Sequence, residues 1–468
     1  ALLYLVSHFT AKGANADTFY MAGRRAPWTL VSYGMIGVAI SGITFISVPG
    51  EVQTSAFSYF QLVIGYALGL ILVALVLLPI YYKSRVISIY SYLENRFGYY
   101  THKSGALFFM LTHLLGASFR LYLMAFVLQL IAFDALNIPF FVTVFITIIL
   151  IWLYTYKGGI KTIIFTDVLQ TTFLLLAIIL CIYSVAQHMQ LSLAGLNNKI
   201  WSSEYSKIFY WSWDSPYNFF KLVLTGMLLT IVANGLDQAI MQKHLTCPRL
   251  IDAKKNIITL AFVLLIVNLI ILFLGAALVL YASEFQVILP GQTDQIYPRL
   301  AVNHLGSVAG VAFIVGIAAA AYSSADSSLT GLTTSFCVDF LGYQTHRADN
   351  SRVRKWVHLG FSILIFVFII LFHLINNESV VSAFIRISGY TAGPLLGLFT
   401  FGIISKRKVH DRIMPLVCLT APLLSYFVNR YSPYLFQGYQ LGYEIIVVNA
   451  ILTLIGIYLF SKNSRVTK

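Results

Sequence analysis

The chain has 468 residues, of which 59% are hydrophobic and only 10% charged, a balance outside the range of soluble globular proteins. Its net charge of +14 would suit nucleic acid, but the basic residues form short clusters between apolar segments and make no basic face or arm. We therefore exclude a nucleic-acid-binding protein. We expect an all-α polytopic membrane protein whose surroundings are the lipid bilayer.

Twelve segments are apolar and long enough to cross a bilayer, which takes about 20 mostly apolar residues. In chain order they are 27–50, 56–82, 104–133, 138–156, 163–187, 217–242, 256–282, 300–341, 356–374, 379–404, 413–429 and 440–461. We expect residues 1–10 to be the end of a further helix that lacks its beginning. That helix would make thirteen.

Lysine and arginine are distributed unevenly between alternate loops. If residues 12–25 are cytoplasmic, 24 of the 31 Lys and Arg fall on the cytoplasmic side, and Lys243 is one of them. Two others, Arg120 and Arg386, lie inside predicted spans. Because basic residues concentrate in cytoplasmic loops, we expect a multi-pass protein of the plasma or inner cell membrane with a cytoplasmic C-terminus.

The first span contains many small and polar residues for a membrane helix. It begins at Pro27, ends at Pro49-Gly50, and contains Gly34, Gly37, Ser41, Gly42, Thr44 and Ser47. Such a helix can break and expose backbone carbonyls to a sodium ion at mid-membrane. Close packing of small residues against a neighbouring helix is the alternative.

Three acidic residues, Asp167, Asp237 and Asp326, lie inside predicted spans. A charge at membrane depth costs at least about 2.5 kcal/mol, so each is a functional candidate. Asp167 is about two turns into its helix, where a helix cap or a salt bridge is the alternative to an ion ligand.

Asp326 is the deepest of the three and lies in a serine-rich segment of the span 300–341. At helical spacing it shares one face with Ser323 and Ser327, so these oxygens could converge on one small cation. Serines alone would suit helix packing, but packing does not need a charge.

The motif Gly-Gly-Ile-x5-Thr-Asp-x2-Gln at 158–170 resembles the signature of the sodium/solute symporter family, which includes the sodium/glucose cotransporters. Further matching pieces occur in the same order along nearly the whole chain: Thr18-Phe-Tyr-Met-Ala-Gly-Arg, Ile43-Thr-Phe-Ile-Ser-Val-Pro-Gly, Tyr92-Leu-Glu-Asn-Arg-Phe, Trp211-Ser-Trp-Asp, Gln238-x3-Gln-Lys and Gly393-Pro-Leu-Leu-Gly-Leu-Phe. The pattern is similar to that of the sialic acid and carboxylate-type members.

This resemblance implies a LeuT-like fold with two inverted five-helix repeats plus extra terminal helices. The repeats would be residues 27–187 and 217–404, separated by an external loop at 188–216 and followed by two additional C-terminal helices in 413–461. The chain would act as a monomer.

The resemblance also implies sodium as the coupling ion, one or two per cycle, and no other cofactor. The common sodium site would use the carbonyls of Gly37, Ile40 and Ala320 with the hydroxyls of Ser323 and Ser324. A second site would use Asp167, Ser323, Asp326 and Ser327. Asp326 stands where the family has a serine, so it would either strengthen that site or replace the ion with a titrating or salt-bridged carboxylate.

The expected substrate pocket differs from that of the sugar transporters and from that of the sialic acid transporters of this family. The gating tyrosine and the nearby asparagine of the sugar transporters match Ala233 and Thr230, and the carboxylate-binding arginine of the sialic acid transporters matches Gly116. Arg120 lies one turn beyond Gly116 on the same helix face, so a shifted anion site is expected. The substrate candidates are Ser41, Thr44, Tyr59, Arg120, Thr230 and Arg386.

The partner of Arg120 is left open by the sequence. A substrate carboxylate is one candidate, and Asp167, Asp326 or carbonyls at a helix end are the others. No nucleophile with a neighbouring base, metal cluster or phosphate-binding loop points to an enzyme.

These observations predict a sodium-coupled secondary transporter. It would import a small organic solute by alternating access, with an anion such as a sialic acid or another carboxylate expected. The alternatives are a symporter of a neutral solute (sugar, polyol or vitamin) and a solute sensor that does not transport.

Overall fold

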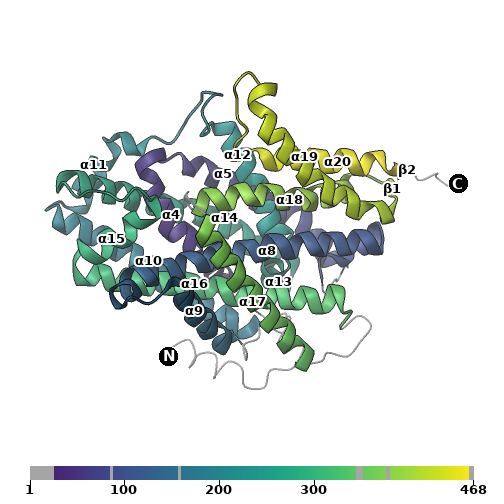
Figure 1. The fold of residues 1–468 in the computed structure, drawn as a ribbon, viewed down its shortest axis with the longest axis horizontal. Coiled ribbons are helices and arrows are strands. Elements are labelled where there is room, and N and C mark those ends of the chain that lie inside the picture. Colours follow the sequence, from purple (N-terminus) through teal and green to yellow (C-terminus); the bar gives the residue numbers. More distant parts are fainter. Residues whose placement is uncertain (1–25, 85–87, 156–159, 344–350, 376–379, 463–468) are drawn as a thin grey trace.

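The computed structural model describes residues 26–84, 88–155, 160–343, 351–375 and 380–462, and these are almost entirely helical (Figure 1). The helices are α3 (Trp28–Ala39), α4 (Gly42–Ser55), α5 (Tyr59–Leu72), α6 (Leu78–Ser84), α7 (Ser91–Arg96), α8 (Tyr99–Leu128), α9 (Phe140–Thr155), α10 (Ile160–His188), α11 (Leu193–Trp201), α12 (Phe219–Thr230), α13 (Gln238–His244), α14 (Leu250–Glu284), α15 (Ile296–Asn303), α16 (Gly306–Ser335), α17 (Ser351–Ile375), α18 (Val380–Ile404), α19 (Met414–Leu435) and α20 (Ile445–Leu459). Two short strands, β1 (Lys408–Val409) and β2 (Ser461–Lys462), pair antiparallel.

All twelve predicted spans are helical in the described part of the chain. Seven are single helices long and apolar enough to cross a membrane, two are pairs of helices bent at a break, and three are shorter apolar helices. In the described part of the chain, up to nine of the twelve predicted spans are therefore confirmed as long enough to cross a membrane, and the other three contain shorter apolar helices. The expected helix end at 1–10 and the glycine pair at 158–159 lie outside the described residues.

The first span breaks between α3 and α4, which meet at an angle of 54°. Ile40 has φ −87° and ψ 72°, and Ser41 is extended with φ −66° and ψ 172°, so neither residue continues the helix. A helix that ends at Ala39 leaves its last carbonyls without their usual partners. The break expected from the glycines and serines is present.

A second break, which the sequence did not predict, divides the span that begins at Phe219. It follows a π-helical turn at Ile231–Gly235, and the segment Phe219–Gly235 meets α13 at 74°. The Asp237 carboxylate caps α13 by accepting a hydrogen bond from the Ile240 N–H at 3.0 Å. This break turns α13 back into the protein, and every residue of α13 except Ile240 is buried.

Small residues allow the central helices to approach closely. Gly65 of α5 faces Gly226 of α12, and a β-carbon on Gly65 would lie 2.8 Å from the Met227 backbone nitrogen. Helix α10 packs against both α3 and α16. The C-terminal helices α19 and α20 pack against α18 at one side of the molecule (Figure 1).

Candidate functional site

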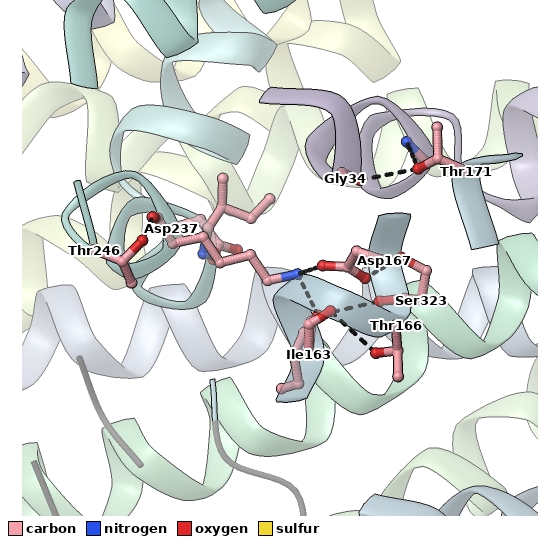
Figure 2. Close-up of polar contacts among 12 residues, drawn as sticks. Gly34, Ile163, Thr166, Asp167, Thr171, Asp237, Thr246 and Ser323 are labelled. Atoms are coloured by element: carbon pink, nitrogen blue, oxygen red, sulfur yellow. Dashed lines mark hydrogen bonds and ion pairs between the residues drawn. The ribbon is translucent and has the colours of Figure 1, made fainter. Parts of the chain in front are cut away.

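A buried polar cluster joins α10, α13 and α16. The Asp167 carboxylate on α10 accepts a hydrogen bond from the Ser323 hydroxyl at 2.7 Å, and its other oxygen is paired with Lys243 Nζ, also at 2.7 Å. Lys243 Nζ donates further to the Ser327 hydroxyl at 2.9 Å. Figure 2 shows Asp167 and Ser323 facing each other within this cluster. The side chains of Asp167 and Lys243 are only 2% and 3% exposed, so both charges are shielded from water.

The sequence counted Lys243 among the basic residues that follow a span on its cytoplasmic side, but the structure places it in the buried helix α13 and not in an exposed loop. The chain turns inward after the second break, and α13 brings Lys243 into contact with Asp167 and Ser327, two of the four ligands expected for a second sodium ion. The side chain of the fourth, Asp326, and that of Ser324 lie outside the described part of the structure.

The expected common sodium site lies at the first break. Thr171 on α10 supports it, because its hydroxyl accepts a hydrogen bond from Gly37 N–H at 3.0 Å and donates to the Gly34 carbonyl at 3.2 Å (Figure 2). Gly37 lies in the last turn of α3 and Ile40 directly follows that helix. Ala320 and Ser323 are buried on α16, which packs against α3 and α4. The Ser323 hydroxyl hydrogen points to Asp167, which leaves its lone pairs for a cation.

The described residues contain no group of three or more His, Cys, Asp or Glu side chains placed to hold a metal ion. Carbonyl and hydroxyl oxygens suit hard cations instead. This donor set fits sodium.

A central cavity lies beside the break in the first span, between α3, α4, α5, α8, the α12–α13 break, α14 and α18. Five of the six predicted substrate residues line it: Ser41, Thr44, Tyr59, Arg120 and Thr230. Ala233 and Gly116, the positions altered relative to the two known patterns, also line it.

Arg386 is the predicted substrate residue that is not among the cavity residues. Its side chain is exposed, whereas its neighbours Ile385 and Ser388 on α18 line the cavity. Helical geometry explains the difference, because Arg386 projects about 100° away from Ile385. We therefore do not carry Arg386 forward as a substrate ligand.

Arg120 supplies a cation to the cavity. Its Nη2 donates to the Ser328 hydroxyl at 3.2 Å, and its buried Nε has no hydrogen-bond partner among the described residues. Asp167, one of its possible structural partners, is paired with Lys243 instead. Nη2 also lies 3.5 Å from where a β-carbon on Gly116 would be. The guanidinium thus extends into the space beside the position that carries the arginine in the sialic acid pattern.

A second polar group in the cavity, His113 with Asp237, was missed by the sequence. His113 Nδ1 is 2.5 Å from the Asp237 carboxylate, while His113 Nε2 and Asn268 Oδ1 are buried without a partner in the described structure. All three residues line the cavity. The sequence did identify Asp237 as an acidic residue inside a span. Because a buried charge needs a partner, Asp237 was the signal that could have led to His113.

A family model for the sodium:solute symporter family matches residues 19–411. The chain belongs to this family. It is 27% identical over 444 residues to the sodium/sialic acid symporter NanT of Aliivibrio fischeri, covering 91% of this chain and 85% of that protein. It is 25% identical to sodium-coupled monocarboxylate transporter 1 of Mus musculus, covering 82% of this chain and 64% of that protein.

Two solved structures share the fold of the present chain. A sodium-coupled sialic acid symporter in a substrate-bound, outward-open state superposes with a TM-score of 0.81 at 22% identity, over 99% of this chain and 97% of that chain. The nucleobase-cation-symport-1 transporter Mhp1 superposes with a TM-score of 0.59 at 16% identity, over 95% of this chain and 94% of that chain. The LeuT-like fold is therefore confirmed, and sodium is the coupling ion of the family.

Proposed function

We propose that the chain imports a small organic anion, a sugar acid of the sialic acid type, together with sodium by alternating access. The carrying observation is Arg120 in the central cavity, with a buried Nε that lacks a partner among the described residues. A buried guanidinium N–H without an acceptor is costly. A carboxylate of the substrate would supply that acceptor together with a compensating negative charge.

The remaining lining favours a polyhydroxylated acid over a short monocarboxylate. The cavity that Arg120 lines is also lined by residues with hydroxyl and amide groups: Ser41, Thr44, Tyr59, Thr112, Thr230, Asn234, Asn268 and Ser388. A ligand with many hydroxyls can use these groups, whereas a short monocarboxylate would leave most of them unpaired. Sialic acid transport by the relative from Aliivibrio fischeri agrees with this choice.

Sodium at the first break would couple the gradient to the cavity, because Ser41 and Thr44 of the same broken span line that cavity. One sodium ion that moves inward across about 100 mV yields roughly 2.3 kcal/mol, and a tenfold gradient adds about 1.4 kcal/mol. Each negative charge on the substrate gives back the electrical part of one ion.

The proposed transport unit is a monomer built from inverted repeats at 27–187 and 217–404, with a cytoplasmic C-terminus. Each proposed repeat begins with a broken helix, α3–α4 in the first and α12–α13 in the second, as expected when two inverted repeats frame a central site. The excess of Lys and Arg in alternate loops supports the orientation even without Lys243.

Uptake into proteoliposomes tests the proposal. Radiolabelled sialic acid should accumulate under an inward sodium gradient and not under a potassium gradient, and Arg120→Gln should reduce kcat/KM at least about 100-fold. Arg299→Gln on the exposed face of α15 is the matched control and should retain uptake.

The other outcomes separate the alternatives. Sodium-driven uptake of lactate but not of sialic acid would show that the substrate is a short monocarboxylate and not a sugar acid. Sodium-driven uptake of a neutral sugar that is retained in the Arg120→Gln variant would show that the substrate is not an anion. Saturable sialic acid binding without any uptake would replace the transporter with a sensor.

A further inference from the structure

The Asp167 carboxylate has a built-in counter-ion. A carboxylate that is only 2% exposed is costly to keep ionised unless a cation lies beside it. Lys243 Nζ supplies one positive charge at 2.7 Å from one Asp167 oxygen. The other oxygen accepts the Ser323 hydroxyl at 2.7 Å.

The ammonium also uses the remaining oxygen of this cluster. Lys243 Nζ donates to the Ser327 hydroxyl at 2.9 Å, and that hydroxyl donates its own hydrogen to the Ser323 carbonyl at 3.1 Å. A sodium ion within reach of Asp167 and Ser327 would have to share the space of Nζ and would be repelled by its like charge. Asp167 and Ser327 therefore cannot bind Lys243 and sodium together.

Lys243 is held in place by its own short helix. Its carbonyl accepts the Thr246 hydroxyl at 2.6 Å, the Asp237 carboxylate caps the start of α13, and the Gln238 side chain accepts a hydrogen bond from the Ile89 N–H at 2.8 Å. The next residue, His244, contacts the amide of Asn256 on α14 at 2.9 Å. A lysine anchored in this way remains with the protein, unlike an ion that is released inward.

We propose that Lys243 is a resident cation that replaces a second sodium ion, so that this chain binds one sodium per cycle at the first break. This inference rests on the proposed sodium-coupled function and specifies its stoichiometry. With one sodium and one monoanion, the transported charges cancel, and accumulation of the substrate would not depend on membrane potential.

Counting sodium ions on the purified full-length chain tests this without any organic substrate. Saturation binding of ²²Na⁺, with N-methyl-D-glucamine as the balancing cation, should reach one ion per wild-type chain and one per Lys243→Arg chain. Lys243→Ala should reach two, because the ammonium no longer occupies the space between Asp167 and Ser327. The double variant Lys243→Ala/Asp167→Asn should return to one, because the attracting charge is gone.

The outcomes distinguish this inference from the proposed function. Two ions on the wild-type chain would overturn the resident cation and leave sodium coupling intact, and this measurement does not require any variant to fold. One ion on a monodisperse Lys243→Ala chain would also overturn it. No saturable sodium binding on the wild-type chain would overturn the sodium-coupled function itself, and the resident cation with it.

Discussion

The hydroxyl of Thr171 lies between two glycine backbones of α3, accepting from Gly37 N–H at 3.0 Å and donating to the Gly34 carbonyl at 3.2 Å. Gly37 is in the last turn before the break, so this one side chain positions the backbone proposed to hold sodium. A β-carbon on Gly37 would overlap the same hydroxyl, which explains why glycine is needed there. Thr171 therefore connects α10 to the backbone of the proposed sodium site.

Thr171→Val should weaken sodium binding more than it destabilises the fold. The change keeps the side-chain volume but removes two buried hydrogen bonds worth about 1 kcal/mol each, so we expect the sodium dissociation constant to rise on the order of tenfold. Thr147→Val is the matched control, because the Thr147 hydroxyl donates at 2.8 Å to Thr143 of its own helix. Equal sodium affinity in the two variants, measured by ²²Na⁺ titration, would contradict the supporting role of Thr171.

The spans and the first break could be predicted from the sequence because both have local signals. A run of apolar residues identifies a membrane helix without knowledge of its neighbours, and the glycines and serines of 27–50 indicate a break in the same way. Five of the six predicted substrate residues line the cavity. They could be predicted because the match to the family pattern assigns each of them to a helix and to a position along it.

Lys243 could not be placed in this way, because its role depends on a turn of the chain and on two distant helices. The residue follows directly after an apolar span, where a lysine ordinarily marks the membrane surface. The only indication in the sequence was the count of charges inside the predicted spans, which is three aspartates and two arginines. One more buried base would balance these charges. The position of Arg386 could not be predicted for a similar reason. The depth of a residue along a helix does not determine the direction in which its side chain points.

Gly116→Leu should interfere with anion binding through Arg120. The glycine leaves the space in which Arg120 Nη2 lies, 3.5 Å from a β-carbon at that position, so a larger side chain would displace the guanidinium. We expect KM for the anion to rise about tenfold with little change in kcat, as for lost binding that is equal in ground and transition states. Gly116→Ala is the control, since its β-carbon would meet Nη2 at 3.5 Å and Phe384 at 3.3 Å, close to ordinary contact. An unchanged KM in Gly116→Leu would separate Arg120 from the substrate.

Asp237 has two roles that two variants can separate. One oxygen caps α13 through the Ile240 N–H at 3.0 Å, and the other pairs with His113 at 2.5 Å in the cavity. Asp237→Asn keeps a capping oxygen and removes the charge, whereas Asp237→Ala removes both. The alanine variant should therefore be less stable than the asparagine variant by about 1 kcal/mol, and both should bind substrate more weakly.

Thermal unfolding and uptake kinetics measure these two effects. Asp214→Ala, on an exposed loop, is the control for loss of an aspartate and should change neither. Equal stability of the alanine and asparagine variants would contradict the capping role. Wild-type substrate affinity in both would show that His113 and Asp237 do not contact the substrate.

The contact of Gly65 with Gly226 should be sensitive to a single added methyl group. Gly65→Ala would place its β-carbon 3.0 Å from the Gly226 α-carbon and 2.8 Å from the Met227 nitrogen. Backbone atoms cannot move aside as a flexible side chain can, so α5 and α12 would have to separate, at a cost of about 1–3 kcal/mol. Gly360→Ala on α17 is the matched control, because no described atom lies within 4 Å of its added methyl. Alanine there should be neutral or stabilising by up to about 1 kcal/mol. Thermal unfolding of both variants in the same detergent checks the difference, and a Gly65→Ala chain as stable as Gly360→Ala would show that these helices are not in direct backbone contact.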